Sequence, residues 1–186
     1  MPEKQNPFWP DESIYFLTGS TFLHFPYFRE PEQKQILLDQ IKKINKILNI
    51  PISAYSIAIN HYHIKFYLKR GLDLAKVRQF LHGGTSFLYR KRFGTKYKEM
   101  WQSFKVIRVI GEEMDSRVTG YIIGNLLKHK EASTFNELKE NHFSSFWYTA
   151  GKHGEEYARD LVYKVIDVPE DAEGNVDAEE LGDIKI

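Results

Sequence analysis

The spacing of hydrophobic positions changes several times along the chain, and each change predicts a different element of secondary structure. Runs rich in aromatic and β-branched residues predict four strands; these lie at 15–22, 52–59, 62–68 and 101–110. Apolar residues recurring at three- to four-residue spacing predict helices at 31–49 and 112–131. Two more helices are expected at 74–93 and 155–168, and residues 143–150 are expected to form an aromatic loop.

These elements follow the order strand, helix, strand, strand, helix, strand, with further helices behind them. Two adjacent strands inside an alternating pattern are typical of a ferredoxin-like α+β fold, an antiparallel sheet with helices mainly on one face. We expect a lead-in over 1–13, this βαββαβ domain over 14–150, and a C-terminal helix with an acidic tail over 151–186. The fold alone selects no function, because it carries RNA binders, metal binders and enzymes.

Composition excludes several kinds of protein. The 186 residues include no cysteine, which excludes a disulfide scaffold, a thiol nucleophile, an iron–sulfur cluster and any cysteine-based zinc site. A hydrophobic fraction of 42% is enough for a folded core. No apolar run approaches the roughly 18 residues of a membrane span, and the first residues do not resemble a signal peptide. We therefore expect a cytoplasmic protein with no membrane partner.

Charge is distributed unevenly, although the formal net charge is only +1. Residues 61–110 contain 12 Lys and Arg against 2 acidic residues, a net charge of +10, with aromatic residues among the cations. Cations that alternate with rings suit single-stranded nucleic acid, because phosphates attract the cations and unpaired bases stack on the rings. Solvated helix faces are the simpler explanation of a short basic run. The cations expected at a nucleic-acid surface are Lys76, Arg78, Arg90, Lys91, Arg92 and Lys105.

The end of the chain is acidic. Residues 155–186 contain 11 acidic residues against 3 Lys and Arg, a net charge of −8. After Pro169 hydrophobic residues are sparse, so we expect a loose tail. Two roles are open: the tail competes with DNA for the basic surface, or it is a solvated extension that keeps the protein soluble.

Two short patterns carry candidate chemistry. Side chains alternate between the faces of a strand, so His61 and His63 point the same way and could bind one metal ion. Two exposed strand histidines are the plainer interpretation. On the following helix, Tyr121 and Asn125 are four residues apart and share a face. The Asn125 carbonyl oxygen suits a hard cation, whereas a core tyrosine and a surface asparagine would need no metal.

At these residues the sequence resembles the IS200-like transposases, the small single-tyrosine members of the HUH nuclease superfamily, and within them the REP-associated tyrosine transposases. The resemblance covers about Tyr15 to Tyr148. The chain differs from the family at Leu126, where a proline is usual, which leaves open the course of the helix after Asn125. The matching motifs are His61-Tyr62-His63, Trp101-Gln102-Ser103-Phe104-Lys105, Tyr121-Ile122-Ile123-Gly124-Asn125, and Phe143-Ser144-Ser145-Phe146.

The resemblance implies a DNA transposition enzyme that cleaves and rejoins single-stranded DNA through a 5′-phosphotyrosine. It implies Tyr121 as the nucleophile, and a divalent ion, Mg²⁺ or Mn²⁺, held by His61, His63 and Asn125. Neutral imidazoles favour Mn²⁺ over Mg²⁺. The expected partner is single-stranded or hairpin DNA, and a homodimer remains open.

Two other functions are considered. A domesticated protein with the same fold could bind hairpin DNA or RNA without cleaving it. A metal-free phosphoesterase would need two H-x-[ST] motifs, and the sequence offers only His142-Phe143-Ser144, so one half is missing. The remaining histidines are expected in surface or structural roles; they are His24, His82, His129 and His153. For His82, which lies beside Gly83 and Gly84, contact with DNA is a second open role.

Overall fold

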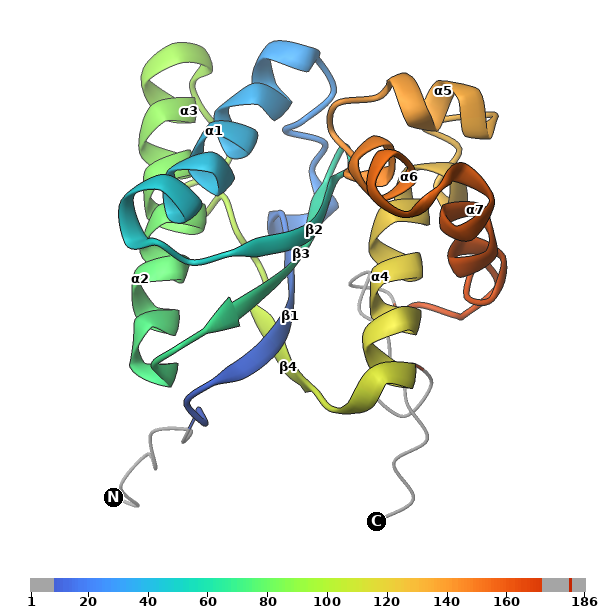
Figure 1. Cartoon of the computed structure of the whole chain (residues 1–186). Helices are drawn as coiled ribbons and strands as arrows, with labels where there is room; N and C mark the ends of the chain where they lie inside the picture. Colours follow the sequence, from blue (N-terminus) through green and yellow to red (C-terminus); the bar gives the residue numbers. More distant parts are fainter. Residues whose placement is uncertain (1–8, 172–180, 182–186) are drawn as a thin grey trace.

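The computed structural model describes residues 9–171 and residue 181 (Figure 1). Most of the predicted lead-in and nearly all of the acidic tail lie outside the described residues. No helix within the described part of the chain is both long and apolar enough to cross a membrane.

Four antiparallel strands form one sheet, in the order β2-β3-β1-β4. This order, with helices between β1 and β2 and between β3 and β4, is the predicted ferredoxin-like arrangement (Figure 1). β3 and β1 are the two central strands, so side chains on both of their faces are buried. The strands are β1 (Ser13–Ser20), β2 (Ile52–Ile57), β3 (His61–Leu68) and β4 (Lys105–Val109).

One face of the sheet is covered by α1 (Pro31–Leu48), α2 (Leu74–Arg78) and α3 (Thr85–Phe93). The helix expected at 74–93 is interrupted by a π-helical segment, Gln79–Gly84, which lies between α2 and α3 and contains Gly83 and Gly84. Gly84 lies against α1, where a Cβ atom would come within 2.5 Å of the Gln40 side-chain oxygen. The missing side chain therefore lets this kinked helix pack closely on α1.

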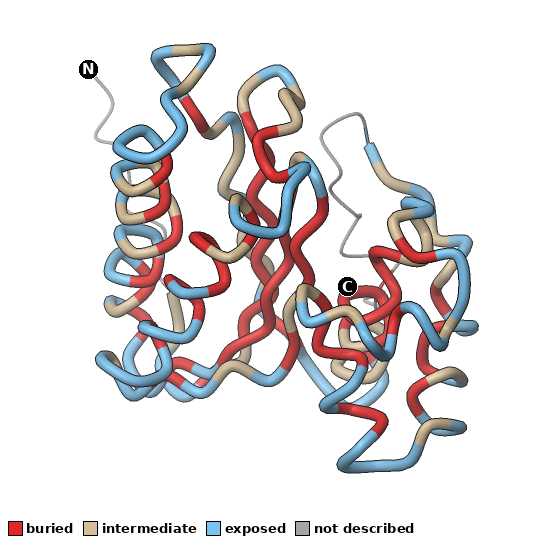
Figure 2. Tube along the Cα trace, turned by 90° about the horizontal axis from the view of Figure 1, so that it is seen from above, coloured by how far each residue is buried: buried red, intermediate tan, exposed pale blue. Residues whose placement is uncertain are grey.

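The opposite face of the sheet is covered by helices that follow β4. Of these, α4 (Gly111–Lys128) packs directly on the strands, and α5 (Phe135–Glu140), α6 (Phe146–His153) and α7 (Glu155–Tyr163) pack on α4 and on one another. Residues along β1 alternate between two cores: Tyr15 and Leu17 join the α1 side, and Phe16 joins the α4 side. The expectation of helices mainly on one face therefore holds for the βαββαβ core alone. The second face of its sheet is buried by the helices that follow β4. Figure 2 shows the strands as the most buried part of the molecule.

Several predicted boundaries differ from the structure. The prediction of an aromatic loop over 143–150 is wrong from Phe146 onward, because α6 begins at that residue. Ser144 forms the turn before it: its hydroxyl donates to the Ile123 carbonyl and accepts from the Phe146 N–H. The last strand begins later than expected, and Trp101 forms only an isolated bridge with Thr21.

Candidate active site

His61 and His63 lie on β3 and face α4. Both are buried, with exposed fractions of 5% and 0%. Their ring centroids are 5.1 Å apart, so the strand places the two imidazoles side by side as its alternation requires. Between them, Tyr62 points to the opposite face and belongs to the other core.

His63 has one satisfied and one unsatisfied ring nitrogen. Thr18 is its cross-strand partner on β1, and the Thr18 hydroxyl lies 2.8 Å from Nδ1 of His63. When Nδ1–H donates to this hydroxyl, Nε2 carries the free lone pair. Nε2 of His63 is buried and has no hydrogen-bond partner, which is costly unless another group binds there.

His61 shows the same arrangement. Its Nδ1 lies 2.8 Å from the Asn60 side-chain oxygen, which can only accept, so Nδ1 donates and Nε2 keeps its lone pair. That Nε2 lies 3.2 Å from Oδ1 of Asn125, a second lone-pair atom, while the Asn125 amide nitrogen has no partner. Two acceptors that face each other favour a cation at this point. Without a cation, a half-turn of the amide would instead let its nitrogen donate to Nε2.

Both imidazoles are neutral near pH 7. Burial and the neighbouring His129 lower the pKa of His61 to about 4, and burial with the His61 neighbour lowers the pKa of His63 well below its ordinary value. Neutral imidazole is the form that binds metals. Among the described residues no three His, Cys, Asp or Glu side chains are grouped as a metal site. The third donor next to the histidine pair is the Asn125 amide, so the residues present fit a divalent ion.

Tyr121 lies one helical turn before Asn125 on α4 and is only 2% exposed. Its ring packs edge-on against His63, with centroids 5.0 Å apart. The hydroxyl lies 2.5 Å from Oε1 of Glu170, to which it donates. Burial and the Glu170 carboxylate raise the pKa of this phenol. The tyrosine thus lies beside the histidine pair, and its hydroxyl proton is engaged in the hydrogen bond to Glu170.

Glu170 and His129 are site residues that the sequence reasoning missed. Burial alone would raise the pKa of Glu170, but hydrogen bonds from His129 and Tyr121 outweigh it and lower that pKa to about 2. Lys128 also lies 3.3 Å from the carboxylate. The His129 ring is 4.6 Å from the His61 ring. The expected loose tail therefore starts inside the site.

Two ion pairs with buried lysines fix α4 on either side of Tyr121. Near its start, Nζ of Lys65 on β3 binds Asp115 at 2.7 Å and Thr119 at 2.6 Å. Beyond its end, Nζ of Lys34 binds Glu131 at 2.6 Å, and the same carboxylate accepts from a backbone N–H in the β2–β3 turn. α4 continues through Leu126 to Lys128, so this departure from the family pattern does not displace Asn125.

Five of the six cations expected at a nucleic-acid surface lie apart from this site. They are on α2 and α3, which cover the other face of the sheet from α4. Arg78 lies over the Phe104 ring at 5.2 Å, and Lys76 pairs with Asp73 at 2.9 Å. Lys105 begins β4 as the cross-strand partner of Thr18, so it lies on the same face of the sheet as the histidine pair. The structure thus unites His61, His63, Tyr121 and Asn125, and places five of the six cations across the sheet.

Comparison with known proteins decides the family. The family model described as "Transposase IS200 like" matches residues 25–125, more than half of the chain, and this segment includes both histidines, Tyr121 and Asn125. The chain belongs to the IS200-like transposase family. A search of curated proteins finds no match to this transposase.

Two solved structures are similar to this chain. A REP-associated tyrosine transposase bound to a REP hairpin matches with a TM-score of 0.63 and 19% identity, covering 94% of this chain and 98% of that chain. At this identity the likeness shows the shared fold. A protein from Deinococcus radiodurans R1 matches with a TM-score of 0.42 and 15% identity over 64% of this chain and 95% of that chain.

Proposed function

We propose that this IS200-like transposase cleaves and rejoins single-stranded DNA through a covalent bond between Tyr121 and a 5′-phosphate. The observation that carries the proposal is the placement of Tyr121 and Asn125 on one helix face against two neutral histidines whose Nε2 atoms face the site. Transposition in this family requires strand cleavage, and these are the groups in the described chain arranged for it.

The step is a substitution at phosphorus. The Tyr121 oxygen gives up its proton and attacks, the new oxygen–phosphorus bond forms, and the bond to the 3′-oxygen breaks, with that oxygen taking a proton. The phosphotyrosine retains the bond energy, so a 3′-hydroxyl can reverse the reaction without ATP. Before attack, the Tyr121 hydroxyl must leave its hydrogen bond with Glu170.

His61, His63 and Asn125 would hold a divalent ion, Mg²⁺ or Mn²⁺, through Nε2, Nε2 and Oδ1. When bound, such an ion supplies Lewis-acid polarisation of a phosphate oxygen. Thr18 and Asn60 orient the two imidazoles by accepting from their Nδ1 atoms. The ion pairs at both ends of α4 keep Asn125 opposite His61.

The experiment that tests this proposal uses a fluorescent single-stranded or hairpin DNA with Mg²⁺ or Mn²⁺. A protein–DNA adduct that survives a denaturing gel, and that disappears with a chelator, is the expected result. A protein that binds the DNA but never forms the adduct would instead be a binding module on the same fold. The burial of Tyr121 and its hydrogen bond to Glu170 are the observations that favour this second function.

Glu170→Gln is expected to speed cleavage. A carboxylate with a pKa of about 2 is a weak base for a phenol, and its charge repels the incoming phosphate. Two like charges at about 4 Å near a surface repel by about 4 kcal/mol, so even a third of that gives about a tenfold faster single-turnover rate. Glu155→Gln, on an exposed ion pair of α7, is the matched control. A slower Glu170→Gln enzyme would show that the carboxylate assists the tyrosine.

Replacing Arg90, Lys91 and Arg92 together by alanine is expected to weaken DNA binding in a salt-dependent way. Each phosphate contact on a single strand contributes roughly −0.7 to the slope of log affinity against log salt. If two or three of these residues contact phosphate, the slope becomes shallower by about one to two units. Fluorescence anisotropy over a salt series measures it, and an unchanged slope would exclude α3 from the DNA surface.

A further inference from the structure

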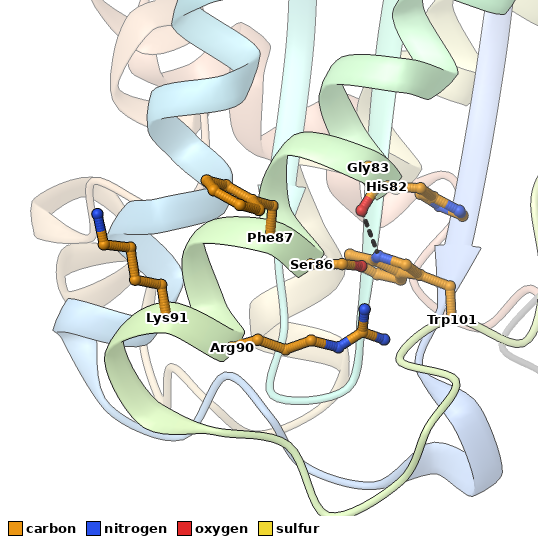
Figure 3. A pocket seen from close by; sticks show the side chains of 7 residues that line it. All are labelled: His82, Gly83, Ser86, Phe87, Arg90, Lys91 and Trp101. Carbon is orange, nitrogen blue, oxygen red and sulfur yellow. Dashed lines mark hydrogen bonds between the residues drawn. The ribbon is translucent and has the colours of Figure 1, made fainter.

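A cavity of about 680 Å³ lies between α3 and the segment that leads into β4 (Figure 3). It is on the opposite side of the sheet from Tyr121, and the candidate active site does not use it. Its lining combines aromatic rings with cations, and none of the described residues that line it is acidic. Those used below are His82, Ser86, Phe87, Arg90, Lys91 and Trp101.

One wall of the cavity is a fixed aromatic platform. The indole N–H of Trp101 donates to the His82 carbonyl at 3.1 Å, and the two rings stack 4.3 Å apart and 7° from parallel. Burial and the nearby Arg78 lower the pKa of His82 to about 3, so this stack is uncharged near pH 7. A preorganised ring loses little freedom when it binds a ligand.

The other wall carries Phe87, which is 67% exposed. It comes from the same helix as Arg90 and Lys91; its ring lies on the side of Lys91, whereas Arg90 extends toward Trp101 (Figure 3). The charged residues of its lining are the cations Arg90 and Lys91. Residues 74–98 contain seven Lys and Arg and no acidic residue, and Asp39 of α1 lies with Lys91 at a neighbouring pocket. A cavity lined by rings and cations is complementary to a flat base that carries its own phosphate.

The cavity and the candidate active site lie on opposite faces of the same strand, β3. Tyr62, between the two histidines of β3, sends its ring to within 5.4 Å of the Trp101 ring and 6.0 Å of the His82 ring, measured between centroids. The same end of the sheet holds the Ser20–His61 pair and the Thr21–Trp101 bridge. A strand of DNA that turns around this end could reach both sides.

We propose that this cavity binds an unpaired nucleotide of the DNA substrate, with its base against Phe87 and Trp101 and its phosphate at Lys91 and Arg90. The inference rests on the proposed function and adds a base-binding subsite to it. Stacking accepts any base, because every base has a flat face. The subsite would therefore hold single-stranded DNA without selecting its sequence.

The test compares two fluorescein-labelled strands of equal length, oligo(dT) and a strand with abasic sites at every internal position. Both carry the same phosphates, and only the first carries bases. Phe87→Ala is expected to lower affinity for oligo(dT) by about fivefold or more and to leave the abasic strand unaffected. Lys91→Ala is expected to weaken both strands equally. Phe87→Trp should retain binding, and Tyr163→Ala, at an aromatic residue 63% exposed on α7, is the control.

Equal losses on both strands, or no loss with Phe87→Ala, would overturn the subsite. If the wild-type protein forms its covalent adduct but binds both strands with the same affinity, the subsite fails and the proposed function stands. If the wild-type protein binds neither strand and forms no adduct, the proposed function itself fails. Circular dichroism of Phe87→Ala checks the fold, which an exposed ring should not disturb.

Discussion

Tyr121→Phe is expected to remove every trace of the covalent DNA adduct. The substitution deletes only the attacking oxygen, and the ring keeps its contacts with His63 and Phe16. Loss of one hydrogen bond to Glu170 costs about 1 kcal/mol of folding stability at most, because the carboxylate retains Lys128 and His129 as partners. The readout is a labelled oligonucleotide on a denaturing gel, with DNA affinity measured in parallel.

The matched control is Tyr148→Phe, at a tyrosine that is 46% exposed on α6. It should form the adduct at the wild-type rate. An adduct that persists in Tyr121→Phe would mean that another residue is the nucleophile, and peptide mapping of the labelled fragment would then identify it. Retained DNA affinity in Tyr121→Phe separates loss of chemistry from loss of binding.

His63→Ala is expected to abolish both cleavage and high-affinity binding of Mn²⁺. The substitution removes the buried Nε2 that has no protein partner. Metal ions contribute several kcal/mol to the stabilisation of developing charge, so the cleavage rate should fall by about a thousandfold. Electron paramagnetic resonance of Mn²⁺ provides a direct binding measurement that does not depend on activity.

Thr18→Val offers a graded comparison with His63→Ala. It keeps both imidazoles and removes the hydroxyl that orients one of them at 2.8 Å. Loss of such an orienting partner typically costs 10- to 100-fold in metal affinity or activity. If His63→Ala binds Mn²⁺ as tightly as the wild-type protein does, His61 and Asn125 do not form a metal site with it.

The βαββαβ core was predictable because its signals are local. Residues 31–49 were expected as a helix, and the structure has α1 at Pro31–Leu48. The residues of the candidate site were also predicted from local signals: spacing by two on a strand and by four on a helix places side chains on one face. The signal for α6 was present but overlooked, since Phe146, Thr149 and Ala150 are buried at helical spacing among exposed aromatic residues.

The missed site residues divide into two kinds. His129 follows Asn125 by four residues and is the C-cap of α4, so the same spacing rule that selected Asn125 could have selected it. Glu170 had no such signal. Its contact with Tyr121 spans 49 residues and depends on α7 packing against Gly120 and Gly124 of α4, where added side chains would collide with Leu161 and Val162. Such tertiary placement cannot be deduced from a nearly featureless acidic segment.

The helix with Tyr121 and Asn125 packs on the sheet of its own chain, with Asn125 3.2 Å from His61. Among the described residues, the groups of the candidate site thus lie together within one polypeptide. Two inactive variants, one lacking His63 and the other lacking Tyr121, would consequently show no complementation when mixed, because exchanging subunits has nothing to restore. Turnover per molecule would also stay constant on dilution, even for a chain that pairs at high concentration.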